Sequence, residues 1–331
     1  MERFDAIVVG GGIIGLASAL RAQERGLRVC VVERGEPGAG ATRTAAGVLA
    51  PDRETPEFTA LARASAERWP AFAAELGGDV GYTRCGSLEL AFAGPPDGEG
   101  WLTGEECRAL EPGVAPDCLG AFVRDEDAQV DPRRVSAELA ARVDDVRTHS
   151  DVVALAPDCV ELADGSRLAG DRIVVATGAW TARRLVPRLP VKPVKGQTLR
   201  LRGPLPATRI IRYEHTYVVP RASGETVIGA TIEDAGFDDA VTDGATALLL
   251  EHAARIVPAV AELELVEASA SLRPGTADDG PLIGEWEGLV LATGHYRNGI
   301  LLAPLTADAI AAILAGDEPP PETAPFTPNR F

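Results

Sequence analysis

The segment DAIVVGGGIIGLASALRAQERGLRVCVVE, residues 5–33, contains a complete strand–helix–strand unit. Residues 5–9 form a short apolar run, which is typical of a strand buried on both faces of a parallel sheet. Small and apolar residues recur at helical spacing over residues 13–23, and Gly26 ends the predicted helix. Residues 27–32 then form a second apolar strand that ends at Glu33. The chain therefore opens with a βαβ unit of a parallel sheet.

The turn of this unit has the spacing GxGxxG at Gly10, Gly12 and Gly15. Gly10 permits a tight turn, Gly12 lets a pyrophosphate approach the backbone, and Gly15 lets the helix pack on the strand. The helix N-terminus offers free N–H groups and the positive end of its dipole to phosphates. Glu33, about twenty residues further on, is placed to accept hydrogen bonds from ribose hydroxyls. The pattern predicts a dinucleotide site, and an ordinary glycine turn is the alternative.

Composition narrows the class of protein. The chain has 331 residues, of which 46% are apolar and 24% charged, as in a soluble globular protein of two domains. A net charge of −17 repels phosphate backbones and anionic lipid, so we expect neither nucleic acid nor membrane as a partner. The N-terminus lacks a signal-peptide pattern and no apolar run has membrane-spanning length, which predicts a cytoplasmic protein. The five cysteines are far apart and lack ligand spacing, so no metal site is expected.

The βαβ character of the start returns in the middle and at the end of the chain, and β-rich segments fill the gaps. We expect helices over residues 57–76, 131–143, 243–257 and 300–314, and a loosely held Pro-rich tail after Asp317. The predicted strands include 86–92, 120–123, 152–155, 160–162, 173–176, 198–202, 217–220, 226–230, 264–272 and 289–292. The fold class is α/β, with a discontinuous cofactor domain of residues 1–80, 131–189 and 270–331 and a β-rich substrate-binding domain of residues 81–130 and 190–269.

Two later segments distinguish FAD from NAD by resemblance. Residues 172–180, RIVVATGAW, resemble the Ala-Thr-Gly strand end of FAD enzymes, where the backbone passes near the cofactor. Residues 291–300, LATGHYRNGI, resemble the late strand-to-helix turn that places a second helix N-terminus beneath the flavin ring. Such a helix end stabilises the negative charge of reduced flavin. The cofactor domain is therefore predicted to be a Rossmann-type FAD-binding domain.

Taken together, these segments resemble the D-amino-acid oxidase superfamily, and most closely the bacterial glycine oxidases of the thiamin pathway. The resemblance covers nearly the whole chain. Its most specific pieces are TAAGVLA at 44–50, YVVPR at 217–221, LRPGT at 272–276 and HYRNGILL at 295–302.

The resemblance implies a set of FAD contacts along the chain. The FAD is expected to be non-covalent, because the surroundings of residues 269–273 lack the cysteine with which sarcosine-oxidase relatives tether flavin. The predicted FAD-binding residues are Gly10, Gly12, Ile13, Ile14, Gly15, Glu33, Arg34, Ala41, Thr42, Ala46, Gly47, Val48, Val152, Thr177, Gly178, Trp180, His295, Tyr296, Arg297, Asn298, Gly299, Ile300 and Leu301.

The resemblance also implies the residues that bind substrate. Arg273 pairs with the substrate carboxylate, since a planar guanidinium can hold a carboxylate through two parallel hydrogen bonds. Tyr217 adds a hydroxyl to the same carboxylate, and Arg297 binds substrate through its side chain or carbonyl. His215 is a candidate for the pocket wall, whereas His295 contributes backbone and is not a base. The structural alternatives are a solvated arginine at 273 and an ordinary strand residue at 217.

One departure from the family pattern concerns the size of the substrate. The chain has no methionine beyond Met1, so pocket positions that carry Met in a glycine oxidase carry Val48 and Ile232 here. The preferred substrate therefore stays open between glycine, sarcosine and a D-amino acid.

The implied reaction is oxidative deamination of glycine and other small amino acids or amines by hydride transfer to flavin N5. It gives the 2-oxo acid, ammonia and hydrogen peroxide, with dioxygen as acceptor and no acid–base residue required. Relatives assemble as homodimers or homotetramers, and the product serves thiamin synthesis or amino-acid catabolism. The alternatives are a D-amino-acid oxidase or dehydrogenase for larger D-amino acids and, in another class, a non-catalytic flavin-binding or tRNA-modifying protein.

Overall fold

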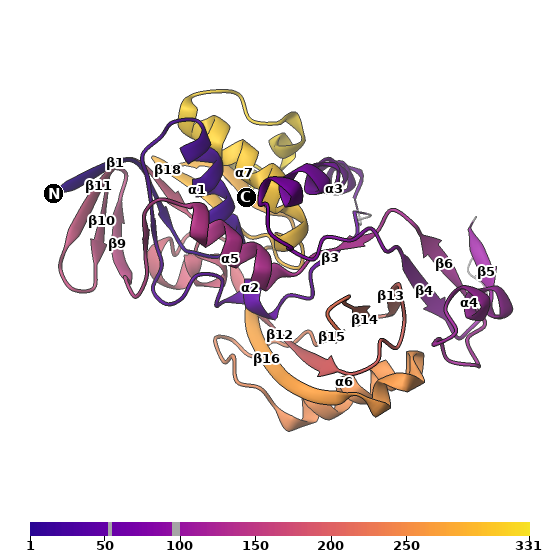
Figure 1. The fold of residues 1–331 in the computed structure, drawn as a ribbon. Helices are drawn as coiled ribbons and strands as arrows, with labels where there is room; N and C mark the ends of the chain where they lie inside the picture. The colour runs from indigo at the N-terminus through magenta and orange to yellow at the C-terminus, as the bar shows by residue number, and fades with distance from the viewer. Residues whose placement is uncertain (52–54, 95–99) are drawn as a thin grey trace.

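Two large sheets form the two lobes of the molecule (Figure 1). The computed structural model describes residues 1–51, 55–94 and 100–331. The predicted domain segments 1–80 and 81–130 each contain residues outside this description, namely 52–54 and 95–99.

The first sheet has eight strands and is mostly parallel. Strands β1, β2, β8, β11 and β18 run parallel, and β17 closes one edge antiparallel to β18. In sheet order the strands are β17 (Leu282–Trp286), β18 (Leu289–Thr293), β11 (Arg167–Val175), β1 (Glu2–Val9), β2 (Val29–Val32) and β8 (Val146–Arg147), and the pair β9 (Val152–Ala156) and β10 (Cys159–Leu162) joins through β10 to β11.

The apolar run of β1 is buried on both faces, as predicted for a central parallel strand. Val8 belongs to one apolar core and Ile7 to another on the opposite side of the sheet. The first core contains the helices α1 (Ile13–Glu24), α3 (Pro56–Glu75), α5 (Pro132–Arg142) and α7 (Gly299–Ala315). In Figure 1, α1 lies directly beside α7, although α1 ends at Glu24 and α7 begins only at Gly299. The first and last segments of the chain therefore form one lobe.

The second sheet also has eight strands, and all neighbouring pairs are antiparallel except β13 and β4. Helix α6 (Asp243–Ile256) covers one of its faces (Figure 1). In sheet order the strands are β16 (Glu264–Gly275), β12 (Lys192–Arg202), β15 (Glu225–Gly229), β14 (Thr216–Pro220), β13 (Ile210–Tyr213), β4 (Ser87–Ala91), β6 (Gly120–Arg124) and β5 (Trp101–Thr103), and α4 (Gly104–Leu110) follows β5.

Alternation along these strands separates two kinds of side chain. Leu199, Val218 and Ile228 face α6 and form the core of the second lobe. Their neighbours Val219 and Val227 point the other way and pack with Ala46 of the first lobe. Every second residue of β12, β14 and β15 therefore faces the first lobe, and this alternation places the functional side chains.

A short two-stranded sheet joins the lobes. It pairs β3 (Val48–Leu49) with β7 (Ala128–Gln129). The buried Arg221 donates hydrogen bonds to the Val130 carbonyl at 2.9 Å and to the Ala46 carbonyl at 2.7 Å. A guanidinium that follows β14 of the second sheet thus holds backbone packed against the first lobe.

The predicted α/β class and the predicted helices are confirmed, with ends that shift by one or two residues. Strand β16 continues to Gly275, beyond the predicted end at 272, so Arg273 lies on a strand. The prediction of a loosely held tail after Asp317 is wrong. Residues 321–326 form a 3₁₀-helix, and the buried Phe326 packs on Phe58 with ring centroids 5.5 Å apart. The prolines of this tail interrupt the sequence patterns of helices and strands. They do not prevent one aromatic side chain from packing in a core.

Candidate active site

One cavity of about 590 Å³ lies between the two lobes. The carboxyl ends of β1, β2, β11 and β18 meet along its edge, where parallel α/β sheets bind their ligands. The face of the second sheet opposite α6 forms its other wall. Segments from the beginning, middle and end of the chain therefore line one space.

The glycine turn after β1 is shaped by close backbone contacts. Gly10 has a φ of +110°, and a Cβ there would lie 2.5 Å from the Ala176 carbonyl oxygen. A Cβ on Gly15 would lie 2.0 Å from the Gly10 carbonyl oxygen, so only glycine lets α1 approach the strand. The space in front of Gly12 is open, because the nearest atom to a Cβ there would be Thr42 Oγ1 at 3.5 Å. The turn leaves room for a ligand against the backbone of Gly12.

Two helices begin at this cavity without a side-chain hydrogen bond from their own N-cap residues. Gly12 precedes α1 and Asn298 precedes α7, and neither helix has an acidic residue in its first turn. Ile13 N donates to Thr42 Oγ1 at 3.1 Å. Uncapped N-termini carry unsatisfied N–H groups and partial positive charge, so both favour negative groups of a ligand.

Glu33 is held in place by the backbone on either side of it. Its Oε2 accepts from Gly11 N at 2.6 Å and its Oε1 accepts from Gly35 N at 2.9 Å. A carboxylate has further acceptor positions, which leaves it able to bind hydroxyls of a ligand. At the same end of the cavity, the Arg34 guanidinium lies 4.0 Å over the ring of Trp180, which in turn packs on Phe237.

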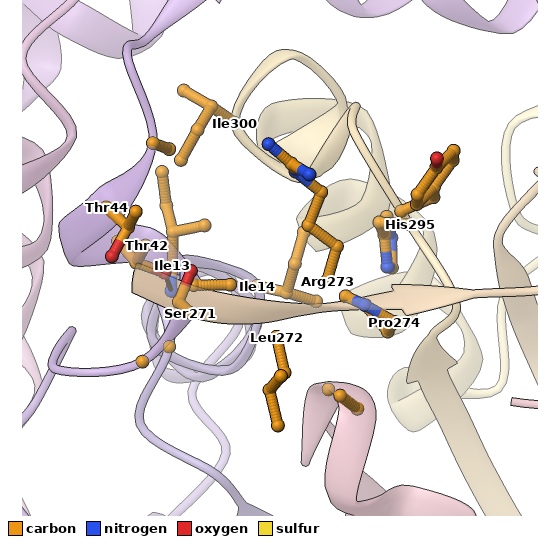
Figure 2. Close-up of a pocket in the computed structure, with 18 of the residues that line it drawn as sticks. Ile13, Ile14, Thr42, Thr44, Ser271, Leu272, Arg273, Pro274, His295 and Ile300 are labelled. Carbon is orange, nitrogen blue, oxygen red and sulfur yellow. Dashed lines mark hydrogen bonds between the residues drawn. The ribbon is translucent and has the colours of Figure 1, made fainter. Parts of the chain in front are cut away.

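Arg273 is a half-buried cation that forms no ion pair with a carboxylate of the described residues. Figure 2 shows it pointing into the cavity from β16, while the preceding Leu272 points to the other side of the strand. Its Nη1 donates to the carbonyls of Thr231 at 3.0 Å and Lys195 at 3.4 Å. Among the residues that the structure describes, no carboxylate lies within 4.0 Å of it, and Nη2 and Nε donate no hydrogen bond. Burial lowers the pKa of this guanidinium, so an anion in the cavity would relieve its desolvation.

Tyr217 faces the same cavity from β14. Burial raises the pKa of its hydroxyl, and the positive charges of Arg273, Arg297 and Arg212 partly oppose the rise. The hydroxyl is therefore a neutral donor near three guanidinium groups. Arg212 stands opposite Tyr217 in the β13–β14 register and forms an ion pair with Asp127 at 3.8 Å.

His295 lies in the turn between β18 and α7. Its Nε2 is 3.0 Å from Thr306 Oγ1, and burial lowers its pKa to about 3. The imidazole is neutral at physiological pH and is enclosed by the protein, so it is unsuited to act as a general base. The next residue anchors the turn to the second lobe, because Tyr296 N donates to the Pro274 carbonyl at 2.9 Å.

Nearly all the residues predicted for the site line this cavity. They include the four substrate candidates, with Arg297 and His215 as exposed residues at its edge, and both Val48 and Ile232. Gly15 lies behind the turn. Leu301 points into the helical core instead, and its carbonyl accepts from Ser65 Oγ at 2.7 Å and Trp69 Nε1 at 2.9 Å. The side chain of Leu301 therefore does not line the cavity, but its N–H belongs to the uncapped first turn of α7, so its contact with the ligand stays a prediction.

Several lining residues were not singled out from the sequence. They come from the second sheet, from loops or, for Arg184, from the π-helical turn Thr181–Leu185, and no local pattern marks them. Arg212 is opposite Tyr217 in the β13–β14 register, and this register is seen only in the folded sheet. The lining residues that sequence reasoning missed include Arg184, Thr198, Arg212, Asp239, Ser271 and Asp279.

The residues present fit the FAD that the sequence predicts. The open space at Gly12 and the uncapped N-terminus of α1 suit a pyrophosphate, and Glu33 suits ribose hydroxyls. The uncapped N-terminus of α7 suits a ring that becomes negative on reduction. In the described segments 1–51, 55–94 and 100–331, no group of three or more His, Cys, Asp or Glu residues could hold a metal ion.

Comparisons with known proteins add to this geometry. Residues 5–313 match the model of the family described as "DAO: FAD dependent oxidoreductase". The chain is 34% identical to the glycine oxidase of Geobacillus kaustophilus, covering 99% of this chain and 97% of that protein. It is 35% identical to the bifunctional protein ThiO/ThiG of Synechocystis sp. over 99% of this chain, and it spans only 54% of that protein.

A solved structure agrees with the sequence match. The crystal structure of glycine oxidase from Geobacillus kaustophilus superposes with a TM-score of 0.93 and 32% identity, covering 100% of both chains. The glycine oxidase of Bacillus cereus superposes with a TM-score of 0.88 at 29% identity, covering 95% of this chain and 98% of that one. The similarity therefore extends over both lobes.

Proposed function

The chain belongs to the DAO family of FAD-dependent oxidoreductases, and from this premise we propose that it oxidises glycine and other small amino acids or amines. With a primary amino acid the products are the 2-oxo acid, ammonia and hydrogen peroxide, because water hydrolyses the imine and dioxygen takes up the two electrons. A secondary amine such as sarcosine releases the corresponding amine in place of ammonia. The observation that carries the proposal is Arg273, a half-buried guanidinium in the cavity wall that has no carboxylate of the described chain within 4.0 Å. An α-amino acid supplies the missing carboxylate.

Arg273 and Tyr217 orient the substrate. The Nη1 atom of Arg273 is committed to backbone carbonyls, which fixes the plane of the guanidinium and leaves its other donors for a carboxylate. The hydroxyl of Tyr217 donates to the same carboxylate. When bound, FAD supplies a two-electron acceptor for the hydride of the α-carbon, and fixed orientation of that carbon is the main contribution of the protein.

The site promotes loss of the amine proton without a general base. Three guanidinium groups act on the same part of the cavity, and nearby positive charge favours the neutral form of a substrate ammonium group. His295 is neutral and buried, and it makes its contact with Thr306. The proton therefore passes to solvent, and the arginines both hold the carboxylate and activate the amine.

The proposal extends to partners and location. It includes dioxygen as electron acceptor, assembly as a homodimer or homotetramer, a cytoplasmic location and a role in thiamin synthesis, which is supported by the likeness to relatives named ThiO/ThiG. No helix of the described residues is both long and apolar enough to cross a membrane. We also propose that residues 1–80, 131–189 and 270–331 form the FAD-binding domain and that the second sheet forms the substrate-binding wall.

Substrate turnover tests the proposal directly. The purified flavoprotein is assayed for peroxide with glycine, sarcosine, D-alanine and bulky D-amino acids. Glycine and its small analogues should give the highest kcat/KM. A strong preference for bulky D-amino acids would favour a D-amino-acid oxidase instead, and reduction of the flavin without peroxide would favour a dehydrogenase.

Arg273→Ala tests the assigned clamp. We expect KM for glycine to rise about 30-fold or more, because truncating one partner of a desolvated charge pair costs about 2 kcal/mol or more. The matched control is Arg188→Ala, which removes an exposed arginine paired with Glu287 and should leave KM unchanged. An unchanged KM in Arg273→Ala would refute the assignment of Arg273.

A further inference from the structure

The guanidinium of Arg273 lies flat over a glycine of the neighbouring strand. A Cβ built on Gly196 would lie 2.2 Å from each of Cζ, Nη1 and Nη2 of Arg273. No real Cβ tolerates that distance. The backbone of Gly196 is outside the left-handed region, so its own conformation would accept alanine. The need for glycine at this position comes from the side chain above it.

Tyr217 rests on a second glycine in the same way. A Cβ on Gly229 would lie 2.4 Å from the Tyr217 hydroxyl oxygen, 2.5 Å from Cζ and 2.7 Å from Cε2. The two residues are direct partners in the β14–β15 register. The backbone of Gly229 is again outside the left-handed region. Here too the side chain, and not the local backbone, excludes a Cβ.

The two glycines are diagonal neighbours on one face of the sheet. Gly229 pairs with Thr198 of β12, and Gly196 is two residues along that strand on the same face. Diagonal positions in an antiparallel pair are about 7–8 Å apart. Two groups that lie over such positions can each donate a hydrogen bond of about 2.8 Å to opposite oxygens of one carboxylate.

We propose that Gly196 and Gly229 are positioning residues that form a shelf for the two carboxylate-binding groups of the site. They act through Arg273 and Tyr217, and they set the spacing at which the guanidinium and the hydroxyl meet an α-carboxylate. The inference rests on the proposed function, since it takes the carboxylate clamp as given. It assigns recognition of the carboxylate to four residues on four adjacent strands, and two of these residues are glycines without a side chain.

The test uses Gly196→Ala and Gly229→Ala in the FAD-loaded protein. The probe is glycolate, a carboxylate of the size of glycine that lacks the amine, and its dissociation constant is measured by calorimetry. We expect glycolate to bind about 10-fold to 100-fold more weakly to each variant, and KM for glycine to rise with it while kcat changes less. The control is Gly244→Ala in the first turn of α6, where a Cβ would meet nothing within 4 Å, and its glycolate affinity should be that of the parent.

Double variants separate the shelf from a general structural effect. On an Arg273→Ala background, Gly196→Ala should cause no further loss of glycolate affinity, because the obstructed guanidinium is gone. The same holds for Gly229→Ala on a Tyr217→Ala background. Additive losses in these pairs, or parent-like affinity in both single glycine variants, would overturn the proposal.

Folding is a second readout. If Gly196→Ala does not fold, the double variant with Arg273→Ala should fold again, since its Cβ then has room. A double variant that stays unfolded would contradict the shelf. The underlying function fails separately. If Arg273→Ala itself binds glycolate like the parent, the clamp is wrong, whereas a strong effect of Arg273→Ala with parent-like binding in both glycine variants rejects only the shelf.

Discussion

The two walls of the cavity use glycine for opposite purposes. In the first lobe, Gly10 and Gly15 let backbone approach backbone, and the atoms that a Cβ would meet are carbonyl oxygens. In the second lobe, Gly196 and Gly229 let side chains lie on backbone, and a Cβ would meet a guanidinium and a phenol ring. Backbone in a packed turn cannot move aside, whereas a side chain can rotate. We therefore expect the cofactor wall, on the first lobe, to be rigid, and the substrate wall, on the second sheet, to adapt through its side chains.

The largest expected effect follows from Gly15→Ala. Its Cβ would lie 2.0 Å from the Gly10 carbonyl, so α1 must move away from β1. We expect a loss of about 3 kcal/mol in the free energy of unfolding and loss of FAD, because the phosphate-binding turn is displaced with the helix. Denaturant unfolding and the flavin absorbance of the purified protein measure both.

The contrast with the second wall sharpens this result. Gly196→Ala should keep FAD and lose carboxylate affinity, whereas Gly15→Ala should lose FAD first. Equal FAD contents in Gly15→Ala and the parent would show that the turn tolerates a side chain, and the distinction between the two walls would fail.

The same distinction explains what the sequence could predict. The turn at Gly10, Gly12 and Gly15 is a local pattern, because its glycines contact backbone within one βαβ unit and the strand beside it. Its elements and their order could therefore be predicted from residues 5–33. The second β-to-helix turn, at residues 291–300, could be found for the same reason.

The substrate wall could be predicted only by resemblance. Arg212 and Tyr217 are opposite each other in the β13–β14 register, and Gly196 meets Arg273 across β12 and β16, 77 positions along the chain. Such pairs depend on strand order and register, which a single sequence does not encode locally. The tail was misjudged for a related reason, since only the packed fold shows that Phe326 reaches Phe58.

A smaller effect is expected from Phe326→Ala, which removes the tail from the first lobe. Phe326 is 6% exposed and packs in the same core as α1, α3 and α7. We expect a loss of about 2 kcal/mol in the free energy of unfolding, below the range for a fully enclosed phenylalanine because the site lies at the end of the chain. Thermal unfolding measures it, with the exposed Phe331→Ala as control. The glycine KM should stay unchanged, and a raised KM would mean that the first lobe also shapes the substrate wall.

The smallest expected effect is a pH dependence at the turn where the two walls meet. Burial lowers the pKa of His295 to about 3, so the folded protein does not bind the proton that the unfolded chain binds near pH 6.5. Stability from this residue is complete above pH 6.5 and is lost as the pH falls below it. Between pH 8 and pH 5.5 the loss should be about 1.4 kcal/mol.

His295→Gln isolates this term, since an amide can keep the contact with Thr306 but does not titrate. Urea unfolding at pH 8 and pH 5.5, with FAD in excess, gives the free energy of unfolding of both proteins. Between these pH values the free energy of the parent should fall by about 1.4 kcal/mol more than that of the variant. The three other histidines are unchanged in the variant, so their contribution cancels. An equal fall in both proteins would mean that water reaches the imidazole in the folded state. The turn between β18 and α7 would then belong with the adaptable substrate wall and not with the rigid cofactor wall.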